Sequence, residues 1–436
     1  MKLLKYLKKL LIFSGFILVI TISLMSGAII ERFNLYPITT KISLFLENSG
    51  LSILRAKVKE SVTTSDETNE IKIFSNYYDL VLKRHLRPSY EDYGGIDLLD
   101  GKLFYVDKKG LGWVQIDNEF EEVLMTPIEL NEAAFTELFG VPSAYSFGVK
   151  DILIIKDKDG FTNNLFMSAV NFNPKQSCYF MSVFLTQIDR DLKQIGDWLN
   201  IFNSSPCLKK HKNNKFAGTS AGGRLGHRGD NLYLSIGDFY FDGINEEDIT
   251  SMQNSDYGKI IEISLNDFKV KHFATGLRNP QGMFVSKEGI FETEHAPQGG
   301  DELNYIGFNQ SSRNYGWPNA TFGVDYGKKI WPLDPENSNF SEDNYTPPIM
   351  SWIPSIGVSN VIEFSSNKSL SRWNENLLIS TLRDKSIYRV KLNNNQPILI
   401  EKIQLDFRMR DLIQHEDSIY ILEAGSRFIW QLKKRN

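Results

Sequence analysis

The sequence predicts an all-β protein, a β-propeller preceded by one membrane-spanning helix and a short stalk. Three observations carry this prediction. Aromatic residues, which pleated and half-buried strands favour, make up 12% of the 436 residues. A hairpin pattern recurs after about residue 80, as expected of blades that bury their faces only against neighbouring blades. An uncharged run at residues 10–30 precedes these repeats and is long enough for one bilayer crossing.

The composition supports a folded body and argues against a nucleic-acid partner. With 42% hydrophobic and 23% charged residues, the chain can bury a core and is not a disordered protein. Four of its 49 basic residues precede the apolar run, so the rest of the chain has 45 basic residues against 53 acidic ones. An acidic balance of this kind excludes a broad nucleic-acid surface, and small molecules are the expected partners.

Residues 1–32 are predicted to be a basic tip and a signal anchor. Lys2, Lys5, Lys8 and Lys9 stand before the uncharged run, which predicts a cytoplasmic N-terminus and a single-pass membrane protein. The propeller would then lie in the periplasm or outside the cell. A cleaved signal peptide is the alternative, because small residues occupy positions suited to cleavage. The run is longer than the usual apolar region of a signal peptide, which favours the uncleaved anchor.

Residues 33–80 are predicted to be a stalk or linker, and residues 81–436 the propeller. The stalk mixes apolar positions with the polar stretch SVTTSDETNE and carries no recognisable chemistry. The chain has two cysteines, Cys178 and Cys207, both on the predicted exported side, where disulfides persist. Pairing would contribute about 3–4 kcal/mol in the chain-entropy model. Two buried free thiols are the alternative, and no zinc or thiol-redox spacing occurs.

The repeated unit is a turn residue, a short alternating strand, a polar gap and a second strand. Blades of roughly 40–60 residues would fit six to eight times after residue 80. A pair of β-sandwiches with coincidental hairpins is the alternative. The unit occurs at residues 101–116, 231–238 followed by 258–265, 376–392, and 417–432.

Residues 276–325 are rich in glycine, proline and asparagine and contain candidate metal ligands. Such residues bring the backbone close to a ligand and expose carbonyl groups. Asp301, Glu302 and Asp325 add hard oxygen ligands of the kind that calcium takes. Tight turns between blades, with solvated acids, are the alternative.

Three arginines near the C-terminus suggest an anion site. Arg383 follows the strand LLIST, and Arg408 and Arg410 alternate in FRMRDL, which places both on one face of a strand. Two such arginines repel each other unless an anion lies between them, and guanidinium groups suit carboxylates. Pairing with nearby aspartates is the alternative, and the candidates are Asp384, Asp406 and Asp411.

Five motifs in order resemble the PQQ-dependent soluble glucose and aldose sugar dehydrogenases, also called glucose/sorbosone dehydrogenases. They are GGRL followed by LYLSIGD, GLRNPQG, EHAPQGGDELN, NYGWP and RMRD. The resemblance covers about residues 80–434 and leaves the anchor and stalk outside. It implies a six-bladed propeller with pyrroloquinoline quinone (PQQ) and calcium at the mouth of the central channel.

The resemblance also implies roles for individual residues. Arg278 and Asn279 resemble the pair that contacts the quinone oxygens, and Arg408 and Arg410 resemble the arginines that hold the PQQ carboxylates. Arg383 stands where the family commonly has a lysine, which keeps the charge but not the shape.

Two calcium sites are implied in the same way. The backbone carbonyls of Ala296 and Pro297 resemble the ligands of the calcium that polarises the quinone. Ala296 replaces the usual glycine, which would restrict the backbone. A structural calcium site is implied at Glu302, Tyr315, Thr321 and Asp325, with Tyr315 and Thr321 acting through their carbonyls.

The catalytic base of the family is missing. A histidine four residues before the arginine of GGRL takes the sugar's proton in the family, and this chain has Ser220 there. A hydroxyl group is no neutral-pH base, and losing a positioned base typically costs ~10²–10⁴ in rate. His211 and His227 are out of register and are expected at the surface or in turns. His295, beside Ala296, is the one nearby replacement, and a structural hydrogen bond is its alternative role.

The sequence thus predicts a membrane-anchored, PQQ- and calcium-dependent oxidoreductase. It would oxidise an aldose sugar or related alcohol and pass electrons to a periplasmic or membrane acceptor. The alternative is a catalytically silent propeller that binds a ligand or partner at the cell surface. The retained arginines favour the enzyme, and the missing histidine favours the binding protein.

Overall fold

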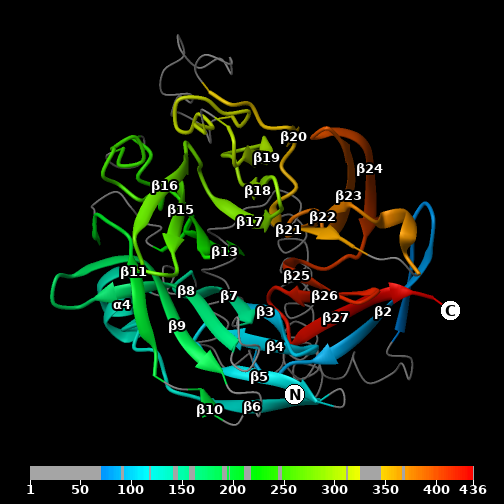
Figure 1. Cartoon of the computed structure of the whole chain (residues 1–436), viewed down its shortest axis with the longest axis horizontal. Helices are drawn as coiled ribbons and strands as arrows, with labels where there is room; N and C mark the ends of the chain where they lie inside the picture. The colour runs from blue at the N-terminus through cyan, green and yellow to red at the C-terminus, as the bar shows by residue number, and fades with distance from the viewer. Residues whose placement is uncertain are drawn as a thin grey trace, which may run out of the picture. The chain divides into compact units, whose positions relative to one another are not determined.

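Antiparallel β-strands make up most of the structure, a computed structural model (Figure 1). The described residues are 70–89, 93–116, 119–140, 146–156, 163–188, 194–195, 197–210, 218–243, 248–310, 313–324, 345–365 and 369–435. The predicted membrane span and nearly all of the predicted stalk lie outside these residues. Among the residues that are described, no helix has the length and apolar character needed to cross a membrane.

The strands form six blades, which confirms the propeller and its blade number. The first blade consists of β3 (Gly94–Leu99), β4 (Lys102–Asp107), β5 (Gly112–Ile116) and β6 (Glu119–Met125). The second consists of β7 (Gly148–Lys156), β8 (Asn163–Asn173) and β9 (Cys178–Ile188), with β11 (Leu199–Asn203) and β12 (Leu208–Lys209) at its edge. The third consists of β13 (Gly222–Arg228), β14 (Asn231–Ile236), β15 (Lys259–Ser264) and β16 (Val270–Thr275). The short β10 (Gln194–Ile195) pairs with both β9 and β6 and so joins the first two blades.

Blades four to six follow the same order from the inside outward. The fourth blade consists of β17 (Pro280–Val285), β18 (Gly289–Glu294), β19 (Asp301–Gly307) and β20 (Met350–Trp352). The fifth consists of β21 (Val358–Phe364), β22 (Asn376–Thr381), β23 (Ser386–Asn393) and β24 (Gln396–Gln404). The sixth consists of β25 (Met409–His415), β26 (Ser418–Glu423) and β27 (Phe428–Lys434), followed outward by β2 (Asp79–Leu86) and β1 (Glu70–Phe74). All four predicted repeats are hairpins of the middle strands: β4–β5, β14–β15, β22–β23 and β26–β27.

The burial of each strand follows from its place in a blade. β18 and β22 are buried at every position, because both faces of a second strand are covered by neighbouring blades. The outer strand β24 instead shows alternation between exposed and more buried residues along much of its length. The helix α4 (Glu132–Phe139), which follows β6 in the chain, contacts β8 of the second blade and packs Phe135 against Phe147.

The ring is closed by pairing of the two ends of the described chain. The inner strands β3, β7, β13, β17, β21 and β25 contact one another in that order, and β25 contacts β3. β2 pairs with β27 from Leu80 opposite Lys434 to Leu86 opposite Phe428. β1 and the first residues of β2 therefore belong to the sixth blade, although they fall within the range assigned to the stalk.

Two buried aspartates, Asp151 and Asp411, and the half-buried Asp97 connect successive inner strands around this closure. Each one accepts a hydrogen bond from a backbone N–H of the next inner strand. The pairs are Asp411 with Ile96 at 3.2 Å, Asp97 with Ile154 at 2.6 Å, and Asp151 with Leu225 at 2.8 Å. Burial raises the pKa of both Asp97 and Asp151 to about 7.

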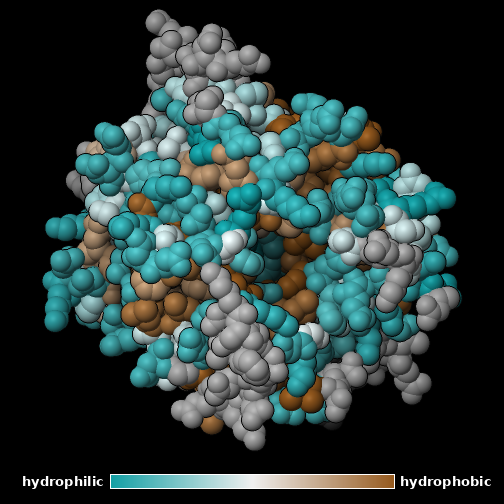
Figure 2. All heavy atoms as spheres, in the orientation of Figure 1, coloured by the Kyte–Doolittle hydropathy of each residue, from teal (hydrophilic) through white to brown (hydrophobic). Residues whose placement is uncertain are grey.

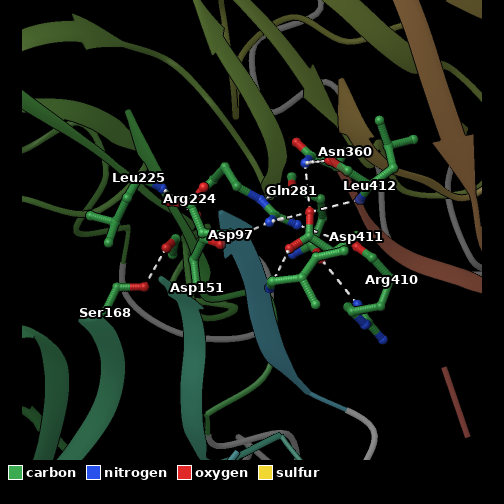
Figure 3. Close-up of polar contacts among 12 residues, drawn as sticks. Asp97, Asp151, Ser168, Arg224, Leu225, Gln281, Asn360, Arg410, Asp411 and Leu412 are labelled. Carbon is green, nitrogen blue, oxygen red and sulfur yellow. Dashed lines mark hydrogen bonds and ion pairs between the residues drawn. The ribbon is translucent and has the colours of Figure 1, made fainter. Parts of the chain in front are cut away.

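Arg224 completes this polar ring, which Figure 3 shows. Its Nη1 lies 2.9 Å from both Asp151 and Asp411, and its Nε donates to the Gln281 carbonyl at 3.1 Å. The arginine of GGRL thus holds together strands from four blades.

Cys178 and Cys207 form a disulfide that fastens β9 to the segment before β12. Of the two possibilities for the cysteines, a pair or two free thiols, the structure therefore shows the pair.

Candidate functional site

The residues predicted from the motifs gather at one end of the ring. The second strand of each blade runs antiparallel to the first, so its last residue returns to the end where the first strand starts. Pro280 of β17 accordingly pairs with Glu294 of β18, and Val358 of β21 pairs with Thr381 of β22. Segments before inner strands and after second strands therefore share one rim. They carry Ser220, Arg278, Asn279, His295, Ala296, Pro297, Arg383 and Arg408, and Arg410 follows at the start of β25.

Ser220, at the position of the missing histidine, is hydrogen-bonded to a buried carboxylate. Its Oγ donates to Asp238 Oδ1 at 2.7 Å. Asp238 also accepts hydrogen bonds from the Tyr240 N–H at 2.9 Å and from Trp317 Nε1 at 3.0 Å. Burial raises the pKa of Asp238 to about 6, although Arg278 acts in the opposite direction. Asp238 ends the LYLSIGD motif, to which sequence analysis assigned no role.

Arg278 is held by the loop that follows β18. Its Nη1 donates to the carbonyl oxygens of His295 at 2.9 Å and Ala296 at 3.0 Å. The backbone N–H groups of Arg278 and Asn279 both donate to Glu294 Oε2. The Ala296 carbonyl, an implied calcium ligand, is therefore already a hydrogen-bond acceptor. A carbonyl oxygen has two lone pairs and keeps one for a cation.

A chain of hydrogen bonds joins the predicted quinone-binding and carboxylate-binding residues. Asn279 Oδ1 accepts from Gln281 Nε2 at 2.8 Å and from the Gly222 N–H at 3.3 Å. Gln281 Oε1 in turn accepts from Arg410 Nη1 at 3.4 Å, the contact drawn in Figure 3. The first residues of β13, β17 and β25 are thus connected through polar side chains.

The three C-terminal arginines differ in environment. β25 begins at Met409 and has a bulge at Arg410, which interrupts the simple alternation expected for Arg408 and Arg410. Arg410 is buried, whereas Arg408 and Arg383 are exposed. The neighbouring aspartates have other partners, because Asp384 binds Lys402 at 2.9 Å and Asp411 binds Arg224. Asp406 accepts from Gln404 at 2.9 Å.

A small acidic cavity lies beside Arg278. Its lining contains five of the residues predicted to bind cofactor or metal, together with three others: Arg278, Ala296, Glu302, Tyr315 and Thr321, with Glu294, Trp317 and Ala320. Burial raises the pKa of Glu294 to about 7 and that of Glu302 well above its usual value. Each of these carboxylates raises the pKa of nearby acids further, since like charges repel.

This cavity has the chemistry of a cation site. Glu292 Oε1 and Asn304 Oδ1 are buried nearby without a hydrogen-bond partner in the structure. Uncompensated carboxylate and amide oxygens are the ligands that calcium prefers. Within the part of the chain that the structure describes, no three acidic, histidine or cysteine side chains already form a metal-ligand group. Asp325 lies outside the described residues, and Pro297 is buried next to Ala296.

The histidines occupy different environments. His295 Nε2 donates to the Val358 carbonyl, so this nitrogen is engaged in a backbone hydrogen bond. Burial lowers the pKa of His295, and Arg278 and Arg410 lower it as well. His227 is exposed in the distal part of β13, and His211 lies outside the described residues.

Two rim residues that sequence analysis did not single out are Lys150 and Tyr93. Lys150 Nζ lies 4.1 Å from the centroid of the Tyr93 ring, and Arg410 Cζ lies 4.3 Å from the same centroid. The signal in the sequence was a lysine within the otherwise largely apolar strand GVKDILIIK.

The space-filling view in Figure 2 shows that the face of the molecule turned to the viewer is hollowed near its middle.

The fold and site together define a six-bladed β-propeller with a mixed cationic and acidic site at one end of its ring. The model of the family described as Glucose / Sorbosone dehydrogenase matches residues 128–428, more than half of the chain. The protein therefore belongs to the glucose/sorbosone dehydrogenase family, as its motifs predicted.

Individual proteins are similar to the chain in sequence or in fold. The chain is 28% identical over 320 residues to the aldose sugar dehydrogenase YliI of Escherichia coli strain K12, an alignment that covers 69% of this chain and 81% of that protein. It is also similar to the structure of the soluble aldose sugar dehydrogenase from Escherichia coli in the apo-form, with a TM-score of 0.65, 20% identity and coverage of 81% of this chain and 100% of that chain. The PQQ-bound aldose sugar dehydrogenase from Streptomyces coelicolor gives a TM-score of 0.58 at 16% identity, covering 82% and 98%.

Proposed function

We propose that this protein is a membrane-anchored oxidoreductase that uses PQQ and calcium to oxidise an aldose sugar outside the cytoplasm. Electrons would pass to a periplasmic or membrane acceptor. The observation that carries the proposal is the hydrogen-bonded series Asn279, Gln281 and Arg410, next to the acidic cavity beside Arg278. One end of the channel thereby offers donors for an anionic, carbonyl-rich ligand and oxygen ligands for a cation.

The residues present fit both groups. Arg410 and Asn279 would hold PQQ through its carboxylates and ring oxygens, and Arg278 lies next to Asn279 along the chain. The Ala296 carbonyl would be a ligand of the calcium beside PQQ and the Glu302 carboxylate a ligand of the structural calcium, and Glu294 lines the same cavity. When bound, PQQ supplies a two-electron acceptor and calcium a Lewis acid. Everything else in the reaction depends on how the protein positions the sugar and removes one proton.

Ser220 and Asp238 supply a route for that proton. Ser220 Oγ already donates to Asp238 Oδ1, so it can accept the sugar's hydroxyl proton as its own proton moves to Asp238. The raised pKa of Asp238, about 6, brings this carboxylate closer to neutral pH than an ordinary aspartate. A relay of this kind is weaker than a positioned histidine, because the serine hydroxyl itself is a poor base.

A titration tests the cofactor half of the proposal. Purified full-length protein in detergent is titrated with PQQ in the presence and absence of calcium, and binding is read from the quinone's absorbance. Saturable binding that strengthens with calcium is expected. Absence of binding under both conditions would contradict the proposal.

A silent binding propeller is the second candidate. Ser220 in place of histidine favours it, as does the engagement of the Ala296 carbonyl by Arg278. Dye-linked oxidation of several aldoses by the PQQ-loaded protein separates the two functions. Turnover that is lost in Asp238→Asn supports the enzyme. Confirmed PQQ binding without any turnover, in wild type and in Ser220→His alike, supports the binding protein.

A further inference from the structure

Lys150 is a buried lysine that forms no ion pair with any acidic side chain that the structure describes. Its exposed fraction is 7%, and lysine is almost never buried unless it is paired. Its Nζ donates to the Ser146 carbonyl, and among the described residues it forms no ion pair. Burial lowers its pKa well below the usual value, and Arg410 and Lys108 lower it further. Among the described residues, the charged groups that act on this ammonium are therefore cations.

Arg410 shares the same surroundings. It is 9% exposed, and its buried Nε has no hydrogen-bond partner in the structure. Lys150 Nζ and Arg410 Cζ lie 4.1 Å and 4.3 Å from the centroid of the Tyr93 ring. An aromatic face offsets only part of the cost of burying two cations together. An anion bound by both cations would offset more and would give Arg410 Nε an acceptor.

The backbone of β13 leaves room for the lysine. Gly223 has a φ of +106°, and a Cβ there would lie 2.4 Å from Lys150 Cβ and 2.7 Å from Lys150 Cγ. Any other residue at this position would collide with the lysine stem. The second glycine of GGRL and Lys150 therefore fit each other, so the buried ammonium is held in a defined place at the rim.

We propose that Lys150 and Arg410 form a carboxylate-binding subsite at the rim, in which Lys150 supplies a contact that the family motifs do not imply. The guanidinium of Arg410 and the ammonium of Lys150, both next to Tyr93, would give one carboxylate charge-assisted hydrogen bonds from two strands, β25 and β7. The carboxylate belongs either to PQQ or to an acidic sugar. If the carboxylate is that of PQQ, the inference rests on the proposed function; if it is that of an acidic sugar, the inference is independent of it.

The test compares Lys150→Met with Lys156→Met in the full-length protein. Methionine keeps an unbranched stem against Gly223 and removes the charge, and Lys156 is an exposed lysine on the same strand. PQQ affinity is measured by absorbance with calcium present, and glucuronate and glucose affinities by calorimetry on PQQ-free protein. Thermal unfolding verifies that each variant folds, and Lys150→Gln is a second neutral variant.

Lys150→Met is expected to lower the affinity for either PQQ or glucuronate by roughly tenfold or more, whereas Lys156→Met should leave both affinities unchanged. Weaker PQQ binding alone assigns the subsite to the cofactor, and weaker glucuronate binding alone assigns it to an acidic sugar. If wild type binds glucuronate but not PQQ, and Lys150→Met loses glucuronate, the subsite stands while the proposed function fails. Unchanged affinities for both ligands in folded variants, or no binding of either to wild type, would overturn the inference.

Discussion

At the scale of single residues, Ser220 stands where the family motif has a histidine, and under the proposed function this residue would determine how a proton leaves the substrate. The serine is not an isolated hydroxyl, because it donates to the buried Asp238. Arg278 is likewise constrained, since its Nη1 bonds two carbonyls of the loop that would hold calcium. Both polar residues are thus held in place by hydrogen bonds, and the proposed proton route through Ser220 would end at Asp238.

Restoring the histidine should increase activity. Ser220→His, loaded with PQQ and calcium, is expected to oxidise aldoses ~10² faster than wild type, because a direct base replaces the serine relay. Initial rates of dye-linked oxidation measure the effect. Ser220→Ala is the matched control and should be slower than wild type. His295→Ala tests the other candidate base; a fast wild type that this change abolishes would show that the base is His295.

At the scale of elements, hydrogen bonds between inner strands determine how the blades are held at the channel. Asp97, Asp151 and Asp411 each accept an N–H from the following inner strand. The first two have raised pKa values, so the folded state binds their protons more tightly than the unfolded chain does. Their contribution to stability is therefore present below about pH 4 and is lost as pH rises through 7.

Stability should consequently fall between pH 5 and pH 8. Asp97→Asn is expected to reduce this fall, because its side chain no longer ionises when buried. Urea unfolding at the two pH values gives the free energies. Asp267→Asn is the control, since this exposed aspartate has a lowered pKa of about 2 and stays ionised throughout the range. An identical pH dependence in wild type and Asp97→Asn would contradict the assignment.

The acidic loops of the fourth blade should be stabilised by calcium. Glu292, Glu294 and Glu302 repel one another in a buried environment, and a bound cation would remove that repulsion. Addition of EDTA is expected to lower the melting temperature, and calcium should restore it. Glu302→Gln should show a smaller response to both. A melting temperature unaffected by EDTA in wild type would argue that no metal stabilises these loops.

At the scale of the whole molecule, the propeller depends on its closing strand. β2 comes from the N-terminal side of the described chain and pairs with β27 along its full length, so the sixth blade is completed by residues far apart in sequence. Leu80 and Leu82 of this strand are fully buried against residues of the fifth and sixth blades. The described unit of residues 70–436 thus includes its own closure.

Weakening the closure should destabilise the ring. Leu82→Ala is expected to lower the free energy of unfolding by about 2–5 kcal/mol, because it leaves a cavity in a core where the side chain is fully buried. Leu86→Ala on the same strand is the control, with an expected change within about 0.5 kcal/mol, since that side chain is 59% exposed. Chemical denaturation measures both; equal effects would contradict the role of the buried face.

The uncharged run at residues 10–30 should keep the protein in membranes. Expressed from its first residue in a Gram-negative host, the full chain is expected to sediment with membranes and to resist extraction by high salt, with the propeller open to protease from outside. Fractionation and protease protection measure this. A soluble periplasmic chain beginning near residue 29 would show instead that the run is a cleaved signal.

The sequence by itself determined the class of fold and the order of its parts, because hairpin periodicity and glycine-rich motifs are local features of the chain. The family motifs also identified most of the rim, including Arg278, Asn279 and Arg410. Only the tertiary structure decided the rest. Asp238 meets Ser220, Lys150 and Arg410 both contact the Tyr93 ring, and β2 closes the ring of blades on β27. Such contacts join residues on different strands, and the distances between them depend on how the blades pack around the channel.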